Sequence, residues 1–145
     1  MKIPTILFMM AVVFFAVGMV ALAGEIRIDA AGGSTAAYID DGGRVENASR
    51  TTIGYINSDG RVENASRTTI GYVDSSGRVE DASRTTIGYI NSDGRVENAS
   101  RTTIAYIENG RIENASRSTM YTYSGLPNYQ ILGAYIFFFG GVGGR

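Results

Sequence analysis

Five glutamates recur at one position of a short repeated motif, and they are the side chains best suited to acid–base chemistry. They are Glu46, Glu63, Glu80, Glu97 and Glu113. Two carboxylates in unlike environments, set close together, can act as a general acid and a general base. A series of equivalent carboxylates offers no such asymmetric pair, and each comes with two arginines of its own copy. We therefore predict a ladder of cross-strand Arg–Glu pairs on a solvated face, and no catalytic residue.

A second set of repeated side chains is suited to binding a ligand. Arginines and tyrosines each recur with the period of the motif, and a degenerate copy at the start of the series adds Tyr38. An exposed ring of tyrosine and arginine would suit sugar binding, whereas tyrosines on β-strands more often pack in the core, which is the reading that we favour. The candidate ligand-binding residues are Tyr55, Tyr72, Tyr89, Tyr106, Arg50, Arg67, Arg84 and Arg101.

Composition excludes several classes of site. The chain has no cysteine and no histidine, which removes thiolate nucleophiles, Cys/His zinc sites and histidine-based triads. The formal net charge of −1 gives no electrostatic footprint for nucleic acid. The Asn-Ser-Asp-Gly loops lack the spacing and the bidentate glutamate of a calcium loop. We expect no cofactor, no metal and no nucleic-acid partner.

The Asn-Ala-Ser triplets match the acceptor sequence for N-glycosylation, but they also suit a turn. They begin at Asn47, Asn64, Asn98 and Asn114, and the corresponding residue of one further copy is Asp81. Asparagine and aspartate replace each other in turns, where either side chain can bond nearby backbone, but aspartate cannot accept a glycan. The substitution therefore favours turns.

The motif repeats every 17 residues, with one step of 16 where a loop loses a residue. A fixed period of this kind indicates a repeated supersecondary unit, and seventeen residues suit two short strands and two turns. The array of copies spans residues 24–125. Its first copy is degenerate and its last copy is partial. The copies span 27–43, 44–60, 61–77, 78–94, 95–110 and 111–125.

Each copy predicts one β-hairpin unit of an all-β protein. In the copy 44–60, residues 44–47 form a short strand, 48–49 a turn, 50–56 a longer strand and 57–60 a hairpin loop, with Gly60 at positive φ. Strict alternation puts two sets of side chains on opposite faces of the longer strand: Thr51, Ile53 and Tyr55 on one, and Thr52, Gly54 and Ile56 on the other.

The two ends of the chain differ from the repeats. Residues 1–23 combine Lys2, an apolar run and a small-residue cleavage site, which predicts a secretory signal peptide and export to the periplasm or the extracellular space. We expect no transmembrane span in the mature chain. The tail 126–145 contains the apolar run 131–139, for which we predict a buried closing strand or a plug in the centre of the array. The competing interpretation is an exposed patch for a partner or a membrane surface.

The chain resembles the small exported five-fold β-flower proteins. The resemblance rests on Asp-Gly-Arg-Val-Glu-Asn-Ala-Ser-Arg-Thr-Thr-Ile-Gly-Tyr, which begins at Asp59, and on its copies, the leader and the Phe-rich end 134–139. It implies short hairpins around a pseudo-five-fold axis and no established activity. The degenerate first copy and the drifting last copy fit a closed array in which residues 25–28 and the tail complete the ring. The alternative architecture is an open β-solenoid, in which identical residues stack in straight ladders.

Two classes of function remain. The favoured one is an exported, non-catalytic binding or structural module whose partner is a glycan or an envelope component. The other is a carbohydrate-active enzyme that uses the repeated carboxylates. Near-identical copies count against an enzyme, which needs a unique site, whereas weak multivalent binding profits from copies.

Overall fold

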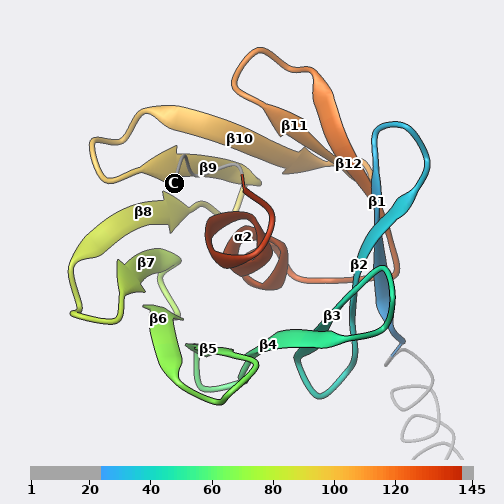
Figure 1. The fold of residues 1–145 in the computed structure, drawn as a ribbon. Helices are drawn as coiled ribbons and strands as arrows, with labels where there is room; N and C mark the ends of the chain where they lie inside the picture. Colours follow the sequence, from blue (N-terminus) through green and yellow to red (C-terminus); the bar gives the residue numbers. More distant parts are fainter. Residues whose placement is uncertain (1–23, 142–145) are drawn as a thin grey trace, which may run out of the picture.

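Twelve antiparallel strands close into one ring around a central helix in the computed structural model, which describes residues 24–141 (Figure 1). Strands that follow each other in the sequence pair with each other, and β1 pairs with β12 to close the ring. The open solenoid is therefore wrong, and the predicted leader lies outside the described residues. The elements are β1 Ile26–Ala30, β2 Thr35–Ile39, β3 Arg44–Asn47, β4 Thr52–Ile56, β5 Arg61–Asn64, β6 Thr69–Val73, β7 Arg78–Asp81, β8 Thr86–Ile90, β9 Arg95–Asn98, β10 Thr103–Glu108, β11 Arg111–Asn114, β12 Thr119–Ser124 and α2 Tyr129–Phe138.

Short turns that end in a left-handed residue connect the strands of the full copies; after β10 the loop is shortened to Asn109 and Gly110, both left-handed. In the loop after β4, Gly60 has φ 86° and its N–H donates to the carbonyl of Asn57 at 3.0 Å, so the positive φ predicted there is confirmed. In the turn after β3, Arg50 takes the same role with φ 63°, which the sequence analysis did not anticipate. The side-chain oxygen of Asn47 stabilises this turn by accepting hydrogen bonds from the N–H groups of Ser49 and Thr51, each at 3.0 Å.

The aspartate copy of this turn behaves in the same way as the asparagine copies. Asp81 accepts hydrogen bonds from the N–H groups of Ser83 and Thr85, at 2.9 and 3.0 Å. The structural role of the Asn-Ala-Ser triplets in turns is therefore confirmed, because either side chain supplies the required oxygen.

A β-bulge at the start of each longer strand changes which side chains share a face. Thr52 pairs with Glu46 and Gly54 pairs with Val45, so Ile53 is the extra residue. The strand begins at Thr52, and Thr52 lies on the same face as Tyr55. The strict alternation expected from the sequence is wrong here, because one inserted residue reverses the phase of a period-two pattern.

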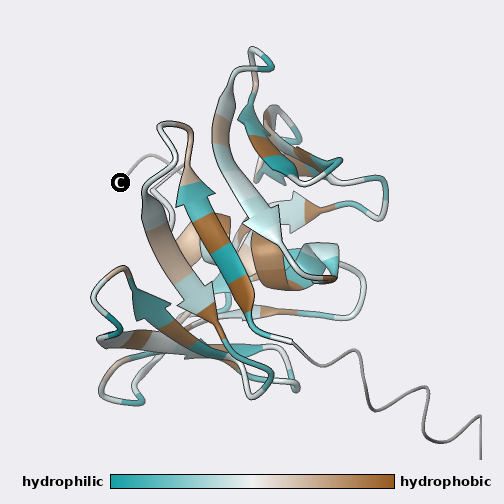
Figure 2. Ribbon diagram, turned by 90° about the vertical axis from the view of Figure 1, so that its right-hand side faces the viewer, coloured by the Kyte–Doolittle hydropathy of each residue, from teal (hydrophilic) through white to brown (hydrophobic). Residues whose placement is uncertain are grey.

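The apolar tail forms a helix in the centre of the ring, and Figure 2 shows this helix, largely coloured as hydrophobic, among the strands. Leu132, Ala134, Tyr135 and Ile136 are buried against the inward-facing side chains of the strands. The side chain of Asn128 caps the helix by accepting a hydrogen bond from Ile131 N–H at 2.8 Å. The expected closing strand is therefore wrong, the expected central plug is what the structure contains, and the ring is closed by β1 and β12. Within residues 24–141, no helix is both long enough and apolar enough to span a membrane.

Three consecutive phenylalanines at the end of the helix fit against three glycines of the ring. Phe137, Phe138 and Phe139 contact Gly88, Gly71 and Gly54, which occupy the same position in β8, β6 and β4. A Cβ added at Gly54 would lie 2.5 Å from the ring of Phe139. The sequence analysis gave these glycines no role; the structure shows that they make room for aromatic rings.

Candidate binding surface on the outer wall

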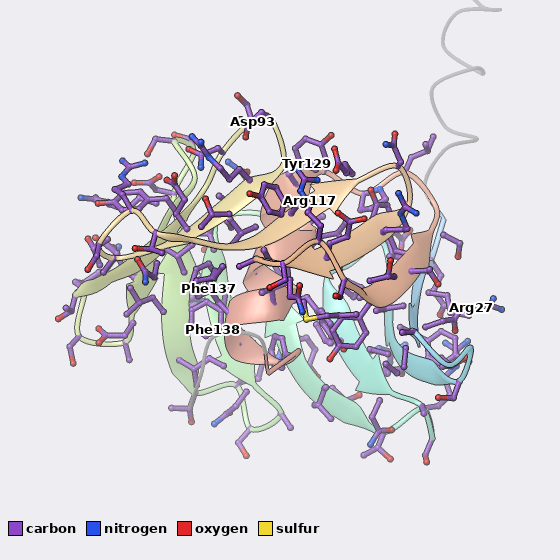
Figure 3. All side chains as sticks on the ribbon, turned by 90° about the horizontal axis from the view of Figure 1, so that it is seen from above. Arg27, Asp93, Arg117, Tyr129, Phe137 and Phe138 are labelled. Atoms are coloured by element: carbon purple, nitrogen blue, oxygen red, sulfur yellow. The ribbon has the colours of Figure 1, made fainter. Side chains whose placement is uncertain are left out.

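The outer wall of the ring repeats one arrangement of tyrosine and arginine five times within the described residues. The guanidinium of Arg67 lies over the ring of Tyr55, with Cζ 3.3 Å from the ring centroid. The arginine always comes from the copy that follows the copy of the tyrosine, so each stack joins two neighbouring units. Figure 3 shows side chains of this kind projecting around the strands, Arg117 among them. The other pairs are Arg50–Tyr38, Arg84–Tyr72, Arg101–Tyr89 and Arg117–Tyr106.

A glutamate lies beneath two arginines in each of these units. Glu63 accepts a hydrogen bond from Nη1 of Arg67 at 3.0 Å, and its other oxygen lies 3.4 Å from Nε of Arg61. All five such glutamates are buried, with 4% to 9% of their surface exposed. The expected solvated ladder of cross-strand pairs is therefore wrong. Both arginines belong to the same copy as their glutamate, and together they cover it.

Asparagine adds a further hydrogen bond to some of these carboxylates. Nδ2 of Asn57 donates to Glu63 at 3.1 Å, and this bond, followed by the one from Arg67, lowers the pKa of Glu63. For Glu97, burial opposes ionisation, but hydrogen bonds from Asn91 and Arg101 outweigh it and also lower the pKa. The sequence analysis placed Asn57 only in a loop. The signal that it missed is the repeated spacing: Asn57 lies six residues before Glu63, and Asn91 lies six residues before Glu97.

The tyrosines fit neither of the two alternatives that the sequence left open, which were packing in the core and an exposed ring for sugar binding. Tyr55 and its equivalents are half-buried on the outer wall, and an arginine covers one face of each ring. They are neither layers of the core nor bare platforms for a sugar. The structure thus brings the candidate tyrosines and arginines together, and the arginine is the more accessible partner.

Arginines in the middle of the series are the most open. The side chains of Arg67, Arg84 and Arg101 are 58%, 63% and 58% exposed, and each pairs with one carboxylate through Nη1. Arg50 also pairs with Glu25, and Arg117 also pairs with Glu108. The guanidiniums at the two ends of the series therefore each form an ion pair with a second carboxylate. A guanidinium held in place with exposed N–H groups can bind a carboxylate, phosphate or sulfate group.

Acid–base chemistry fits this surface poorly. A general acid at neutral pH needs a raised pKa, whereas Glu63 and Glu97 have lowered ones. Among residues 24–141, the acidic side chains form no group of three that could hold a metal ion.

Replacement of Tyr55 by alanine is expected to lower the free energy of unfolding by about 1–2 kcal/mol, because the ring is half-buried and stacked. In a double-mutant cycle with Arg67→Ala, chemical denaturation should show that the two substitutions together cost less than the sum of their separate effects. Arg101→Ala removes the same group from a distant copy, so its effect should add to that of Tyr55→Ala. Equal coupling with both arginines would contradict the stacking.

Comparison with known proteins places this arrangement in a family. Neither the curated proteins nor the solved structures contain a match to the chain. A family model described as "5-fold beta-flower protein" matches residues 25–139, a span that includes all twelve strands and the helix. The resemblance stated from the sequence is thereby confirmed, as are the all-β repeats and their closure. A five-fold axis is not evident from the strand order, which contains six consecutive strand pairs, although the Tyr–Arg stack occurs five times. The chain belongs to the 5-fold β-flower family.

Proposed function

We propose that the protein is a non-catalytic binding module that is exported and engages a repetitive, acid-bearing ligand, such as an acidic glycan of the envelope or the surroundings. The observation that carries the proposal is the repeated Tyr–Arg–Glu unit on the outer wall, with three open guanidiniums in successive copies. A polymer with a regular series of carboxylates could contact several of them at once.

Multivalency explains why near-identical copies would be useful. One exposed guanidinium–carboxylate contact contributes about 0.2–1 kcal/mol, which is too little for specific binding. Contacts linked on one rigid ring raise the overall affinity, because each contact after the first is intramolecular. Stacking on tyrosine also reduces the side-chain entropy that an arginine loses when it binds.

The alternative, a carbohydrate-active enzyme, gains no support from the geometry. The candidate carboxylates are equivalent, buried beneath arginines and partly stabilised as anions. Hydrolysis of a glycosidic bond by two carboxylates requires one of them to hold a proton at the working pH.

The test is affinity electrophoresis in gels that contain alginate, an acidic polysaccharide, with dextran as the neutral reference. The protein is recovered from the exported fraction, and its intact mass should show that it begins at Gly24. Alginate should retard the wild type, and the triple variant Arg67→Gln, Arg84→Gln, Arg101→Gln should bind about ten-fold or more weakly, by summing the exposed contacts.

The chain offers a matched control for this experiment. Arg61→Gln, Arg78→Gln and Arg95→Gln remove the same charge from the same three copies and leave the same glutamates, but these arginines do not stack on tyrosine. This control should keep most of the affinity. Equal losses of affinity in the two triple variants would show that alginate responds only to the net charge of the protein. Equal mobility of the wild type in alginate and dextran gels would refute binding to an acidic glycan.

A further inference from the structure

One end of the ring contains a hollow of about 800 Å³ whose lining includes none of the stacked tyrosines and arginines. It lies between the loops that follow β2, β4 and β6 and the segment that joins β12 to α2. Its volume falls within the range of pockets that hold small ligands or a few residues of a peptide, about 300–1,000 Å³. The sequence analysis did not foresee it, because the loops that line it also occur elsewhere in the ring.

The position of the helix explains why the hollow occurs on one side. Helix α2 packs against β6, β8 and β10, and Nε2 of Gln130 donates to the carbonyls of Asp74 and Ser75, each at 3.2 Å. Tyr129 lies beside Gly94 in the loop after β8. The beginning of the helix is therefore held towards these later copies, and the space towards β1 and β4 remains open.

The floor of the hollow is apolar. Ile26, Ile56, Val73 and Ile131 line it from three strands and the helix. At its edge lies Leu126, which is 80% exposed and is the large hydrophobic side chain of residues 24–141 that is open to solvent. An exposed leucine that continues an apolar floor provides surface for an apolar group of a ligand.

The rim of the hollow is acidic. Asp40, Asp41, Asp59 and Asp74 line it; Asp40 and Asp74 pair with Arg44 and Arg78, each at 3.2 Å, so Asp41 and Asp59 are the rim carboxylates that have no ion pair within residues 24–141. A hydrogen bond from the hydroxyl of Ser76 lowers the pKa of Asp74, so this carboxylate is charged at neutral pH. An apolar floor beside the carboxylates of Asp41 and Asp59 complements a ligand that joins apolar groups to a positive charge.

We propose that this hollow binds a short segment of a partner polypeptide that carries lysine or arginine next to apolar residues. The apolar side chains occupy the floor and meet Leu126, and the basic group lies at the aspartate rim. The site does not depend on the proposed function of the outer wall, because the two surfaces share none of the arginines or tyrosines of the stacks.

The probe is the capped peptide acetyl-Leu-Lys-Leu-Lys-amide, with acetyl-Leu-Glu-Leu-Glu-amide as its matched opposite. Titration of the ¹⁵N-labelled protein should shift the amide signals of Gly43, Ser58 and Ser75 with the lysine peptide and not with the glutamate peptide. The amides of the loop after β8, around Gly94, should not respond.

Two near-identical loops supply the control variants. Asp59 and Asp93 hold the same place in Asn-Ser-Asp-Gly and accept the same hydrogen bond, from the N–H of Arg61 and of Arg95, but Asp59 lines the hollow and Asp93 does not. Asp59→Asn should raise the Kd of the lysine peptide about three-fold, the size expected for one exposed ion pair, and Asp93→Asn should leave it unchanged. Leu126→Gln should also weaken binding, because it removes the apolar edge.

Three results would overturn the assignment. One is the absence of shifts with the lysine peptide at millimolar concentration; another is equal affinity for the glutamate peptide. The third is a set of shifts at the same amides that depends on protein concentration and not on peptide, which would assign the hollow to a second copy of the chain.

Discussion

Replacement of Ile136 by aspartate is expected to unfold the protein. Ile136 is fully buried in the helix at the centre of the ring, and a carboxylate there would have no polar partner among the apolar residues of the core. Burial of an unpaired charge costs about 4–5 kcal/mol or more, which is close to the whole stability of a small domain. Far-ultraviolet circular dichroism and size-exclusion chromatography should show loss of the strand signal or aggregation.

A control substitution in the same tail distinguishes the loss of helix packing from the effect of an added negative charge. Leu126→Asp introduces the same side chain at a position that is 80% exposed. Its free energy of unfolding should stay within about 0.5 kcal/mol of the wild type. A cooperative, wild-type melting curve for Ile136→Asp would show that the helix does not lie inside the ring.

Replacement of Gly71 by alanine is expected to destabilise the protein by about 2–3 kcal/mol. The new Cβ would overlap the ring of Phe138, and it would lie 2.6 Å from the carbonyl oxygen of Glu80. Overpacking of a filled core typically costs about 1–3 kcal/mol, because side chains and backbone must shift. Urea denaturation should report the loss as a lower midpoint with an unchanged slope.

A second substitution tests whether the aromatic ring is the cause. Phe138→Leu in the Gly71→Ala background should recover part of the lost stability, since the smaller side chain gives the methyl group room. Phe138→Leu alone should destabilise, because it leaves Gly71 facing a gap. Ala105 and Ala37 hold the position of Gly71 in other copies, so the backbone at this position accepts a methyl group. Strictly additive effects of the two substitutions would show that ring and glycine do not interact.

Local features of the chain were readable from the sequence because they depend on neighbouring residues. The 17-residue period located the strands and turns, and Gly60 at the end of its loop predicted a left-handed residue, since glycine adopts positive φ without a steric penalty. The replacement of asparagine by Asp81 predicted a turn that needs only a side-chain oxygen. The family resemblance also rested on these repeated residues alone.

The candidate surface was predicted only in part. The sequence singled out tyrosines and arginines that the structure brings together, but it could not show that Arg67 covers Tyr55, because the two residues belong to different copies. It placed Glu63 on a solvated face, because alternation along a strand takes no account of the arginines that cover this side chain. The hollow depends on the side of the ring against which the helix packs, and the repeated motif does not determine that side.

The sequence by itself determined the repeating hairpin, its turns and the apolar character of the tail; only the tertiary structure decided what the tail becomes. A run of nine apolar residues fits a buried strand or a buried helix equally well. Pairing of β1 with β12 closes the ring and leaves no strand edge to accept the tail. A buried backbone must still satisfy its N–H and C=O groups, and inside a closed ring a helix does so within its own segment. The glycines at 54, 71 and 88 then provide the space into which the phenylalanines of that helix fit.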